Sequence, residues 1–266
     1  MYSRPISCSS ITEQSTSSFV IFHQQLGCFS SDWHQHEWGQ LIYAEKGCVH
    51  INCQGKKILI PGWYAVWIPA NTNHEIWSTT QQVHIRSVCF PVNILNTSLV
   101  QSVGVFPISA LLKEMIMYTE KWSHDQPDNL RAVTFLQAVQ DVIASEIQNS
   151  ISVHLPSTIH PKLLPITEYL QRHLPETITF TSLANEFGLS IRTLSRLFAQ
   201  ELGIPFSTYR KISRIMRALE MIEMGSDNVS QLANDVGYDS VATFSNNFLK
   251  ICGFRPLQFI NSKHTK

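Results

Sequence analysis

The sequence predicts an α+β protein of more than one domain, with an N-terminal β-barrel flanked by helices and a C-terminal all-α domain. Three observations predict it. Short strand-like segments with frequent turns fill the first third, two amphipathic helical stretches follow, and a six-residue motif occurs twice in the last third. The chain of 266 residues, 44% of them hydrophobic, is long enough for two ordinary domains with packed cores.

Short strands are expected between residues 19 and 92, where β-branched and aromatic residues lie between turn-forming residues. The expected strands are Phe19–Gln25, Gly39–Glu45, Val49–Cys53, Lys56–Ile60, Tyr64–Ile68, His74–Trp77 and Val83–Phe90. The turn residues are Gly27, Gly47, Gly55, Gly62 and Asn71. Many short strands with frequent turns are typical of a sandwich or a barrel.

Two amphipathic helices are expected within residues 108–148, because apolar residues recur there at helical spacing. They are Leu111, Leu112, Met115 and Ile116, followed by Val133, Leu136, Val139, Ile143 and Ile147. Such helices either cover their own barrel or pair with a second subunit, and both interpretations stay open. The proline-containing segment 150–165 has no clear period, which predicts a linker. We therefore divide the chain into a polar tail (1–18), a first domain (19–150), a linker (151–160) and a second domain (161–266).

The second domain contains an internal repeat. Leu183–Gly188 (LANEFG) recurs as Leu232–Gly237 (LANDVG), 49 residues later. Each copy ends at a glycine, which can close a helix in the left-handed conformation without a Cβ penalty. Ser190 and Ser240 follow at a position suited to capping the next helix. A helix, a tight glycine turn and a second helix form a helix-turn-helix unit.

The second helix of each unit is expected to bury an apolar face and to present a polar one. The expected inward residues are Ile191, Leu194, Leu197 and Phe198 in the first copy and Val241, Phe244, Phe248 and Ile251 in the second. The side chains expected to contact DNA are Arg192, Thr193, Ser195, Arg196, Ala242, Thr243, Ser245 and Asn246. The major groove accepts a helix, and arginine and short polar side chains can reach base edges there.

The charge distribution favours a polyanionic partner for the second half of the chain. Residues 1–158 hold 8 Lys+Arg and 11 Asp+Glu, a net charge of −3, whereas residues 159–266 hold 12 and 9, a net charge of +3. A long helix is expected over residues 206–224, joining the two units. Its basic residues are either phosphate contacts or a solvated flank: Arg210, Lys211, Arg214 and Arg217.

Residues 161–260 resemble the DNA-binding domain of the AraC/XylS family of bacterial transcription regulators. The resemblance rests on LANEFGLSIRTLSRLFAQELG (183–203) and LANDVGYDSVATFSNNFLKICGFRP (232–256). It implies that each unit places its second helix in the major groove, on successive turns of one DNA face. Two positions depart from the family: Asn246 stands where an arginine is usual, and Phe259-Ile260 where an aromatic–arginine pair is usual. The first departure predicts weaker base reading by the second unit.

The first domain resembles the cupin barrel, in which two histidines, a glutamate and a third histidine converge on a metal. His34 and His36, followed by Gln40 and Gly47, match the first cupin motif, and Pro69 and His74 match the second. Gln40 stands at the glutamate position, and Asn71 replaces a usual glycine. The alternation of His34, His36, Trp38 and Gln40 predicts one strand face turned to the barrel interior.

An effector pocket is the preferred interpretation of this polar face. Its candidate residues are His34, His36, Gln40, Trp67 and His74, and Trp77 and Phe90 are further apolar candidates that fit a core equally well. The resemblance implies a small effector bound without metal, because regulators of this family commonly use such a barrel in that way. No cofactor or metal is therefore expected. A Zn, Fe or Ni site at His34, His36 and His74 stays open as an alternative, as do purely structural histidines.

Together these features predict a sequence-specific transcription regulator, activator or repressor, that responds to a small molecule and is not an enzyme. The expected partners are double-stranded DNA, the effector, RNA polymerase and a second copy of the chain. A metal-dependent cupin enzyme with a helical appendage and an effector-independent DNA-binding protein are the alternatives. No secretory signal, membrane helix or paired cysteine spacing is recognisable, so we expect a cytoplasmic, nucleoid-associated protein.

Overall fold

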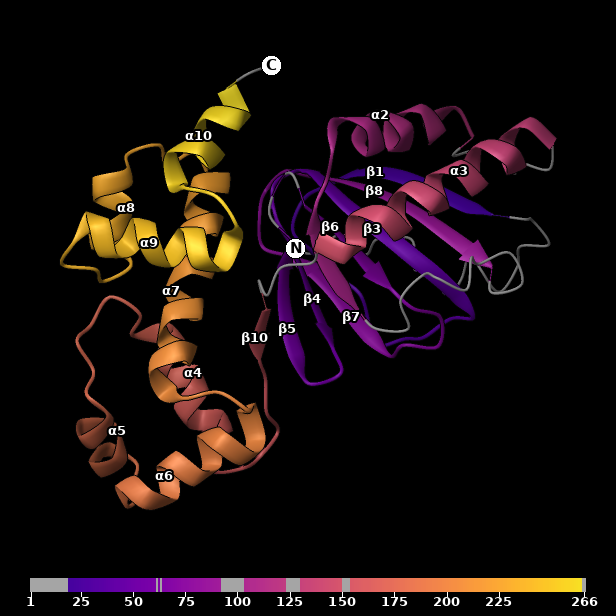
Figure 1. The fold of residues 1–266 in the computed structure, drawn as a ribbon. Coiled ribbons are helices and arrows are strands. Elements are labelled where there is room, and N and C mark those ends of the chain that lie inside the picture. The colour runs from indigo at the N-terminus through magenta and orange to yellow at the C-terminus, as the bar shows by residue number, and fades with distance from the viewer. Residues whose placement is uncertain are drawn as a thin grey trace. The chain divides into compact units, whose positions relative to one another are not determined.

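The computed structural model describes residues 19–60, 62, 64–91, 103–122, 130–149 and 154–264 (Figure 1). The expected tail 1–18 and residues 151–153 of the expected linker lie outside this range. The contacts divide the chain into two compact units, Met1–Gln54 with Leu59–Ser152, and Gly55–Ile58 with Val153–Lys266. The first unit is rich in strands and the second is mainly helical, which confirms the predicted fold class.

All seven strands expected from the sequence form, and they belong to two antiparallel sheets. The first sheet has the order β1 (Val20–Leu26), β8 (Val83–Pro91), β3 (Trp38–Lys46), β6 (Tyr64–Ile68) and β9 (Gly104–Pro107). The second has the order β10 (His154–Pro156), β5 (Lys56–Ile60), β4 (Val49–Cys53), β7 (His74–Ser78) and β2 (Phe29–Ser30). The edge strands of one sheet do not pair with those of the other in the described residues, so the expected barrel is not closed.

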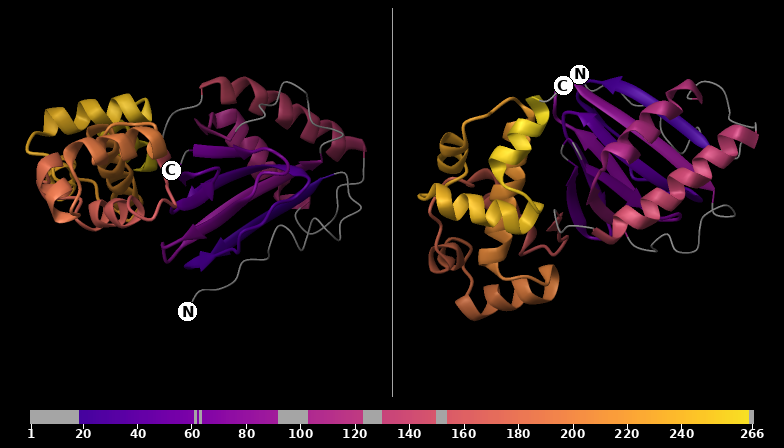
Figure 2. Two further views of the ribbon diagram at one scale, coloured as in Figure 1. Left: turned by 90° about the horizontal axis from the view of Figure 1, so that it is seen from below. Right: turned by 45° about the horizontal axis from the view of Figure 1, so that its top comes forward.

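Helices α2 (Ala110–Tyr118) and α3 (Leu130–Glu146) lie across one face of the first sheet (Figure 2). Short 3₁₀ turns follow them, η2 (Thr119–Trp122) and η3 (Ile147–Asn149). The helices and the sheet share one core, which includes Leu112, Ile116, Leu136, Val139, Ile143, Leu41, Tyr43, Trp67, Phe90 and Phe106. The apolar faces of both helices are therefore buried against their own domain, as the first of the two interpretations expects.

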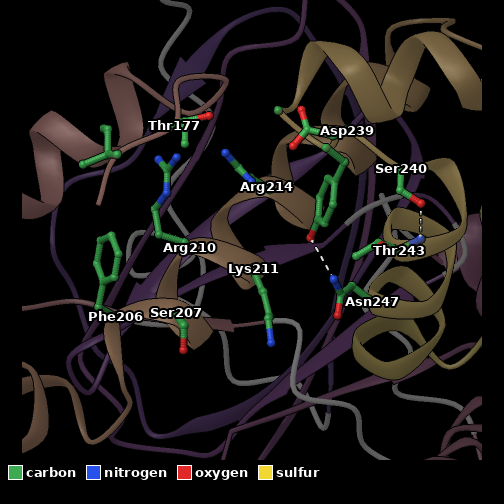
Figure 3. Close-up of a pocket in the computed structure, with 13 residues that line it drawn as sticks. Thr177, Phe206, Ser207, Arg210, Lys211, Arg214, Asp239, Ser240, Thr243 and Asn247 are labelled. Atoms are coloured by element: carbon green, nitrogen blue, oxygen red, sulfur yellow. Dashed lines mark hydrogen bonds between the residues drawn. The ribbon is translucent and has the colours of Figure 1, made fainter. Parts of the chain in front are cut away.

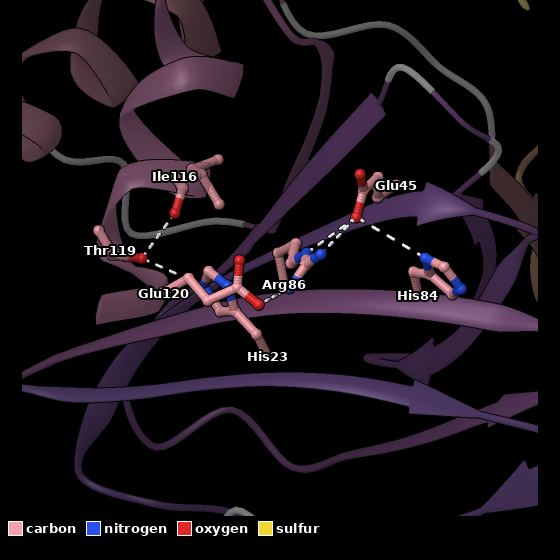
Figure 4. Close-up of polar contacts among 7 residues, drawn as sticks. All are labelled: His23, Glu45, His84, Arg86, Ile116, Thr119 and Glu120. Carbon is pink, nitrogen blue, oxygen red and sulfur yellow. Dashed lines mark hydrogen bonds and ion pairs between the residues drawn. The ribbon is translucent and has the colours of Figure 1, made fainter. Parts of the chain in front are cut away.

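A buried arginine ties the segment after α2 to the sheet. Arg86 of β8 contacts two carboxylates, Glu45 of β3 at 2.7 Å and Glu120 of η2 at 3.2 Å (Figure 4). Nearby, Nε2 of His23 lies 3.1 Å from the hydroxyl of Thr119. Burial, and secondarily the charge of Arg86, lowers the pKa of His23 to about 4, so this imidazole is neutral at pH 7. The arrangement is a structural clamp that holds the helical layer on the strands.

The helical unit consists of two similar halves on either side of one long helix, α7 (Phe206–Glu223) (Figure 1). The first half contains α4 (Leu164–Arg172), α5 (Phe180–Glu186), α6 (Ile191–Leu197) and a π-helical turn, η4 (Phe198–Leu202). The second contains α8 (Val229–Asp235), α9 (Val241–Cys252) and α10 (Pro256–His264). Among the described helices, none combines the length and the apolar character that crossing a bilayer requires.

The turns of the two helix-turn-helix units have the same structure. Gly188 and Gly237 adopt positive φ angles of 61° and 85°, as the repeat predicted. The side chains of Ser190 and Ser240 accept hydrogen bonds from the backbone N–H groups three residues later, and so cap α6 and α9. The backbone hydrogen bonds also match: Gly188 to Asn185 and Leu189 to Ala184 in the first unit, Gly237 to Asn234 and Tyr238 to Ala233 in the second.

Candidate nucleic-acid interface and sensor site

Helix α6 presents a basic, exposed face. Arg192, Ser195 and Arg196 are exposed, whereas Leu194 and Leu197 are buried against the rest of the unit. Within the described part of the chain, neither arginine forms a side-chain hydrogen bond or an ion pair. A stable ion pair of Arg196 with a glutamate of its own domain would have competed with an external ligand, and it does not form. Both guanidinium groups are therefore available to a partner. Thr193 is half-buried, and its hydroxyl lies 2.8 Å from that of Ser190.

The first residue of α6 and the first residue of α9 are exposed rather than buried. Ile191 is 50% exposed and Val241 is 42% exposed, although the sequence placed both on the inward face. Each is the first residue of its helix and stands directly after the capping serine, where helical periodicity alone misplaces it. An exposed apolar side chain at this end of the helix is suited to contact with a thymine methyl group.

Helix α9 presents a shorter and less charged set of side chains. Ala242, Thr243 and Asn246 are exposed and Ser245 is half-buried, while Phe244 and Phe248 are buried in the core. The helix itself carries no cation before Lys250. Taken alone, this face offers a methyl group, hydroxyls and one amide.

Arg255, which sequence reasoning missed, supplies a cation to this face. Its Nη1 donates hydrogen bonds to Ser245 Oγ at 3.1 Å and to Asn246 Oδ1 at 3.0 Å. Gly253 ends α9 with a φ of 84° and turns the chain back, which brings the exposed Arg255 beside the polar face. The nearby glycine was the signal that could have indicated this return of the chain.

The basic residues of α7 have different roles, and two of them bind backbone carbonyls of a neighbouring loop. Arg210 is buried and donates to three backbone carbonyls, those of His173, Leu174 and Glu176. Arg214 donates to the carbonyls of Leu174 and Glu176 and lies over the ring of Tyr238, 5.4 Å from its centroid. The two side chains thus hold the loop after α4 against α7.

A hollow of about 460 Å³ opens beside these arginines (Figure 3). Lys211 of α7 and Thr243 and Asn247 of α9 line it. Lys211 is exposed, whereas Arg217 is engaged by Glu220 at 2.9 Å. Of the four basic residues expected along this helix, Lys211 is the one that remains suited to a phosphate contact.

In the strand-rich unit, three of the expected sensor residues come together as a histidine cluster, formed by His34, His36 and His74. One ring nitrogen of each lies within 4.8 Å of those of the other two. His36 and His74 are buried and His34 is half-buried. The cluster is not built on one strand face as expected: β3 begins only at Trp38, and His34 joins through an isolated bridge to His74 of β7.

Backbone carbonyls orient all three imidazoles of the histidine cluster in the same way. The Nδ1 atoms lie 2.8 Å from Asp32 O, 2.8 Å from Trp38 O and 2.7 Å from Thr72 O, in the order His34, His36 and His74. A carbonyl oxygen only accepts, so each Nδ1 must carry the proton and each Nε2 of the neutral ring has a lone pair. Burial lowers the pKa of His36, and lowers that of His74 to about 4, so both rings are neutral at pH 7.

Gln40 joins the cluster, but the expected aromatic wall does not. Oε1 of Gln40 lies 3.2 Å from His36 Nε2, and its amide nitrogen donates to Ser87 Oγ at 2.9 Å. Trp67 pairs with Leu41 across the first sheet, and both belong to the core under α2 and α3, on the sheet face opposite Gln40. Phe90 lies in the same core, and Trp77 stacks on His50. The structure therefore does not bring these three aromatic residues to the cluster.

Comparison with known proteins accounts for both units. The family model described as "AraC-like ligand binding domain" matches residues 19–131. The model described as "Helix-turn-helix domain" matches residues 183–262. The two models together span most of the chain. This protein belongs to the AraC family of transcription regulators.

Relatives of this AraC-family protein share its arrangement along most of their length. The HTH-type transcriptional regulator NimR of Escherichia coli is 28% identical over 232 residues, covering 87% of this chain and 82% of its own. The HTH-type transcriptional activator RhaS of Escherichia fergusonii is 21% identical over 248 residues, covering 84% and 85%. Among solved structures, fatty-acid-bound ToxT of Vibrio cholerae covers 92% of this chain and 95% of its own with 13% identity and a TM-score of 0.38.

Proposed function

We propose that this AraC-family regulator lays α6 and α9 in successive major-groove turns on one face of DNA and controls transcription there. The observation that carries the proposal is the matched pair of capped helices, each following a glycine turn and each presenting an exposed polar face. A helix of this kind enters the major groove with its N-terminal residues at the base edges. The nucleoid, in the cytoplasm, is the corresponding location.

The proposed base contacts are unequal between the two helices. Arg192 and Arg196, one helical turn apart, can each bond guanine through two hydrogen bonds, while Ser195 and Thr193 offer hydroxyls. On α9, Asn246 suits adenine, Thr243 and Ser245 offer hydroxyls, and Ala242 offers a methyl contact. Arg255 adds a positive charge next to Asn246, and Lys211 between the two helices is placed for the phosphate backbone.

The strand-rich unit is proposed to bind a small-molecule effector that changes DNA binding. Support comes from the ligand-binding family model and from the buried polar group of His36, Gln40, His74 and Ser87, which an enclosed ligand could satisfy. RNA polymerase and a second copy of the chain are further proposed partners. The relatives are transcription regulators, which favours this function over a metal-dependent enzyme.

Titration of a duplex site with the full chain at rising salt tests the proposed interface. We expect log affinity to fall linearly with log salt, because lysine and arginine displace counterions, with a slope of about −0.9 for each phosphate neutralised. Arg255→Ala should weaken binding by about 1–3 kcal/mol if the guanidinium reads a base, or lower the slope by about 1 if it contacts a phosphate.

The matched control for Arg255→Ala is Arg172→Ala, which removes an exposed arginine of α4 that lies 3.9 Å from Glu168. The control should leave both affinity and slope unchanged. Equal behaviour of the two variants would show that Arg255 makes no DNA contact, and a wild-type affinity insensitive to salt would contradict the proposed function itself.

A further inference from the structure

We infer that His34, His36 and His74 form a binding site for a divalent transition-metal ion of borderline softness, such as Zn²⁺, Co²⁺ or Ni²⁺. The site lies in the strand-rich unit, shares His36, His74 and Gln40 with the proposed effector pocket, and does not depend on the proposed DNA contacts. The three side chains come from separate parts of the chain, the segment before β3 and the start of β7, and the His34–His74 bridge brings them together.

The first support is the orientation of the rings. Metal-binding histidines almost always donate the second ring N–H to a carbonyl or a carboxylate, which fixes the tautomer and aims the other nitrogen at the ion. All three rings of the histidine cluster do so, each through Nδ1 and each to a backbone carbonyl two residues away. The shared arrangement leaves Nε2 as the atom of each ring that is free of a proton and able to coordinate an ion.

The second support is that the inward nitrogens lack partners. Nε2 of His34 and Nε2 of His74 are buried, and neither has a hydrogen-bond partner in the described residues. Buried polar atoms are rarely left unsatisfied in native proteins, and a bound ion or water is a usual partner for such atoms. One ring nitrogen of each residue lies within 4.8 Å of those of the other two. Small side-chain movements would therefore place all three nitrogens around one ion at the metal–nitrogen distance of about 2.0–2.1 Å typical of zinc.

The third support is the contact between His36 and Gln40. Because Nδ1 of His36 carries the proton, its Nε2 lone pair faces Gln40 Oε1, also an acceptor, across 3.2 Å. A cation between two acceptors removes this conflict, and Gln40 then provides a fourth ligand atom. The alternative in a metal-free protein is a Gln40 amide turned over, so that its NH₂ donates to His36.

The chemistry of the donors selects the class of ion. Imidazole nitrogens suit Zn, Co, Ni and Cu, whereas Mg²⁺ and Ca²⁺ prefer oxygen ligands. The fourth polar group beside the three imidazoles is the neutral amide of Gln40 and not a carboxylate. A site without an anionic ligand should bind the ion less tightly than one that has a carboxylate, so a carboxylate at position 40 should tighten binding.

Purified full-length protein, stripped with a chelator and reloaded with Co²⁺, tests the inference. We expect about one ion per chain by elemental analysis, with visible ligand-field bands and no near-ultraviolet thiolate charge-transfer band. Thermal unfolding of the loaded protein should shift upward, because an ion that binds the folded state stabilises it by mass action. His34→Ala, in which the altered residue is half-buried and so less essential to the core, should weaken binding at least tenfold.

Two further variants separate loss of a metal ligand from general loss of stability. His50→Ala, which alters a histidine stacked on Trp77 outside the histidine cluster, should bind Co²⁺ as wild type does. Gln40→Glu should raise affinity at least tenfold if the side chain faces the ion, whereas in a metal-free site it would only bury an anion and lower stability. Substoichiometric Co²⁺, a thiolate band, or equal binding by wild type and His34→Ala would overturn the inference. None of these measurements involves DNA, so failure of the metal inference would leave the proposed DNA contacts untouched.

Discussion

Arg196→Ala, or the same change at Arg192, is expected to abolish specific DNA binding or to relax it at one half of the site. Both side chains are exposed on α6, and no internal partner in the described unit competes for them. One bidentate arginine–guanine contact is worth about 1–3 kcal/mol of discrimination, which corresponds to roughly 5- to 150-fold in affinity. Non-specific affinity should fall less, because only one charge is removed.

Asn246→Ala should weaken DNA binding less than Arg196→Ala does. The structure predicts a smaller difference in affinity between the two variants than the sequence alone does. Asn246 Oδ1 accepts a hydrogen bond from Arg255, so its removal also loosens the hold on the Arg255 guanidinium beside this part of α9. For the same reason Asn246→Arg, which restores the residue usual in the family, should tighten binding only modestly, since it places a second cation beside Arg255. The salt slope should still steepen.

Binding titrations of these variants on one footprinted site provide the comparison. Gln200→Ala is the control, since Gln200 is exposed on η4, one helical turn beyond Arg196. We expect the control to bind as wild type does. Equal losses from Arg196→Ala and Asn246→Ala would mean that α6 does not dominate base reading.

Gly237→Ala is expected to destabilise the helical unit far more than Gly188→Ala, although the two glycines occupy equivalent turns. Both have positive φ angles, so alanine at either position costs about 1–2 kcal/mol for the left-handed backbone. At Gly188 an added Cβ would meet nothing within 4 Å. At Gly237 it would lie 2.5 Å from the carbonyl oxygen of Pro175 and 2.7 Å from Nη2 of Arg214.

The close contact at Gly237 cannot be relieved by a side-chain rotation alone. Arg214 can move, but Pro175 O belongs to the loop that Arg210 holds through three backbone carbonyls. The loop must shift or the turn must open, which by analogy with overpacked cores adds about 1–3 kcal/mol. Because this contact joins the two halves of the helical unit, DNA affinity should fall as well.

Calorimetry of the full-length variants, followed by DNA titration, measures both effects. For a domain of about 100 residues, each kcal/mol lowers the melting temperature by roughly 4–8 °C. We expect the helical-unit transition of Gly237→Ala to melt well below that of Gly188→Ala, with weaker DNA binding. Matching melting temperatures for the two variants would show that the loop containing Pro175 moves aside without a loss of stability.

Features with a local pattern could be predicted from the sequence, whereas features that depend on a return of the chain could not. The glycine turns at Gly188 and Gly237 and the capping serines follow from neighbouring residues, and the repeat reinforces each of them. Arg255 acts on Ser245 and Asn246 only because α9 ends and the chain turns back. Arg210 was misinterpreted because a basic residue on a helix gives no sign that the carbonyls of a distant loop will surround it.

The sensor residues show the same limit. The histidines were predicted to converge, but through strand alternation, whereas pairing of His34 with His74 is what assembles them. Trp67 lies on a strand that is buried along its whole length, so its sequence does not indicate which face meets the helices and which meets the interior. Its partner in the sheet, Leu41, decides that Trp67 belongs to the core under α2 and α3.

Selection of bound duplexes from a random-sequence DNA library by the full-length protein tests whether α6 and α9 read one DNA site together. We expect one enriched motif with two specified clusters, centred about one helical turn or 10–10.5 base pairs apart. The cluster read by α6 should be the more strictly specified, with guanines that lose enrichment when Arg192 or Arg196 is replaced. Recovery of unenriched DNA, or of a single cluster that survives these replacements, would contradict reading by two helices.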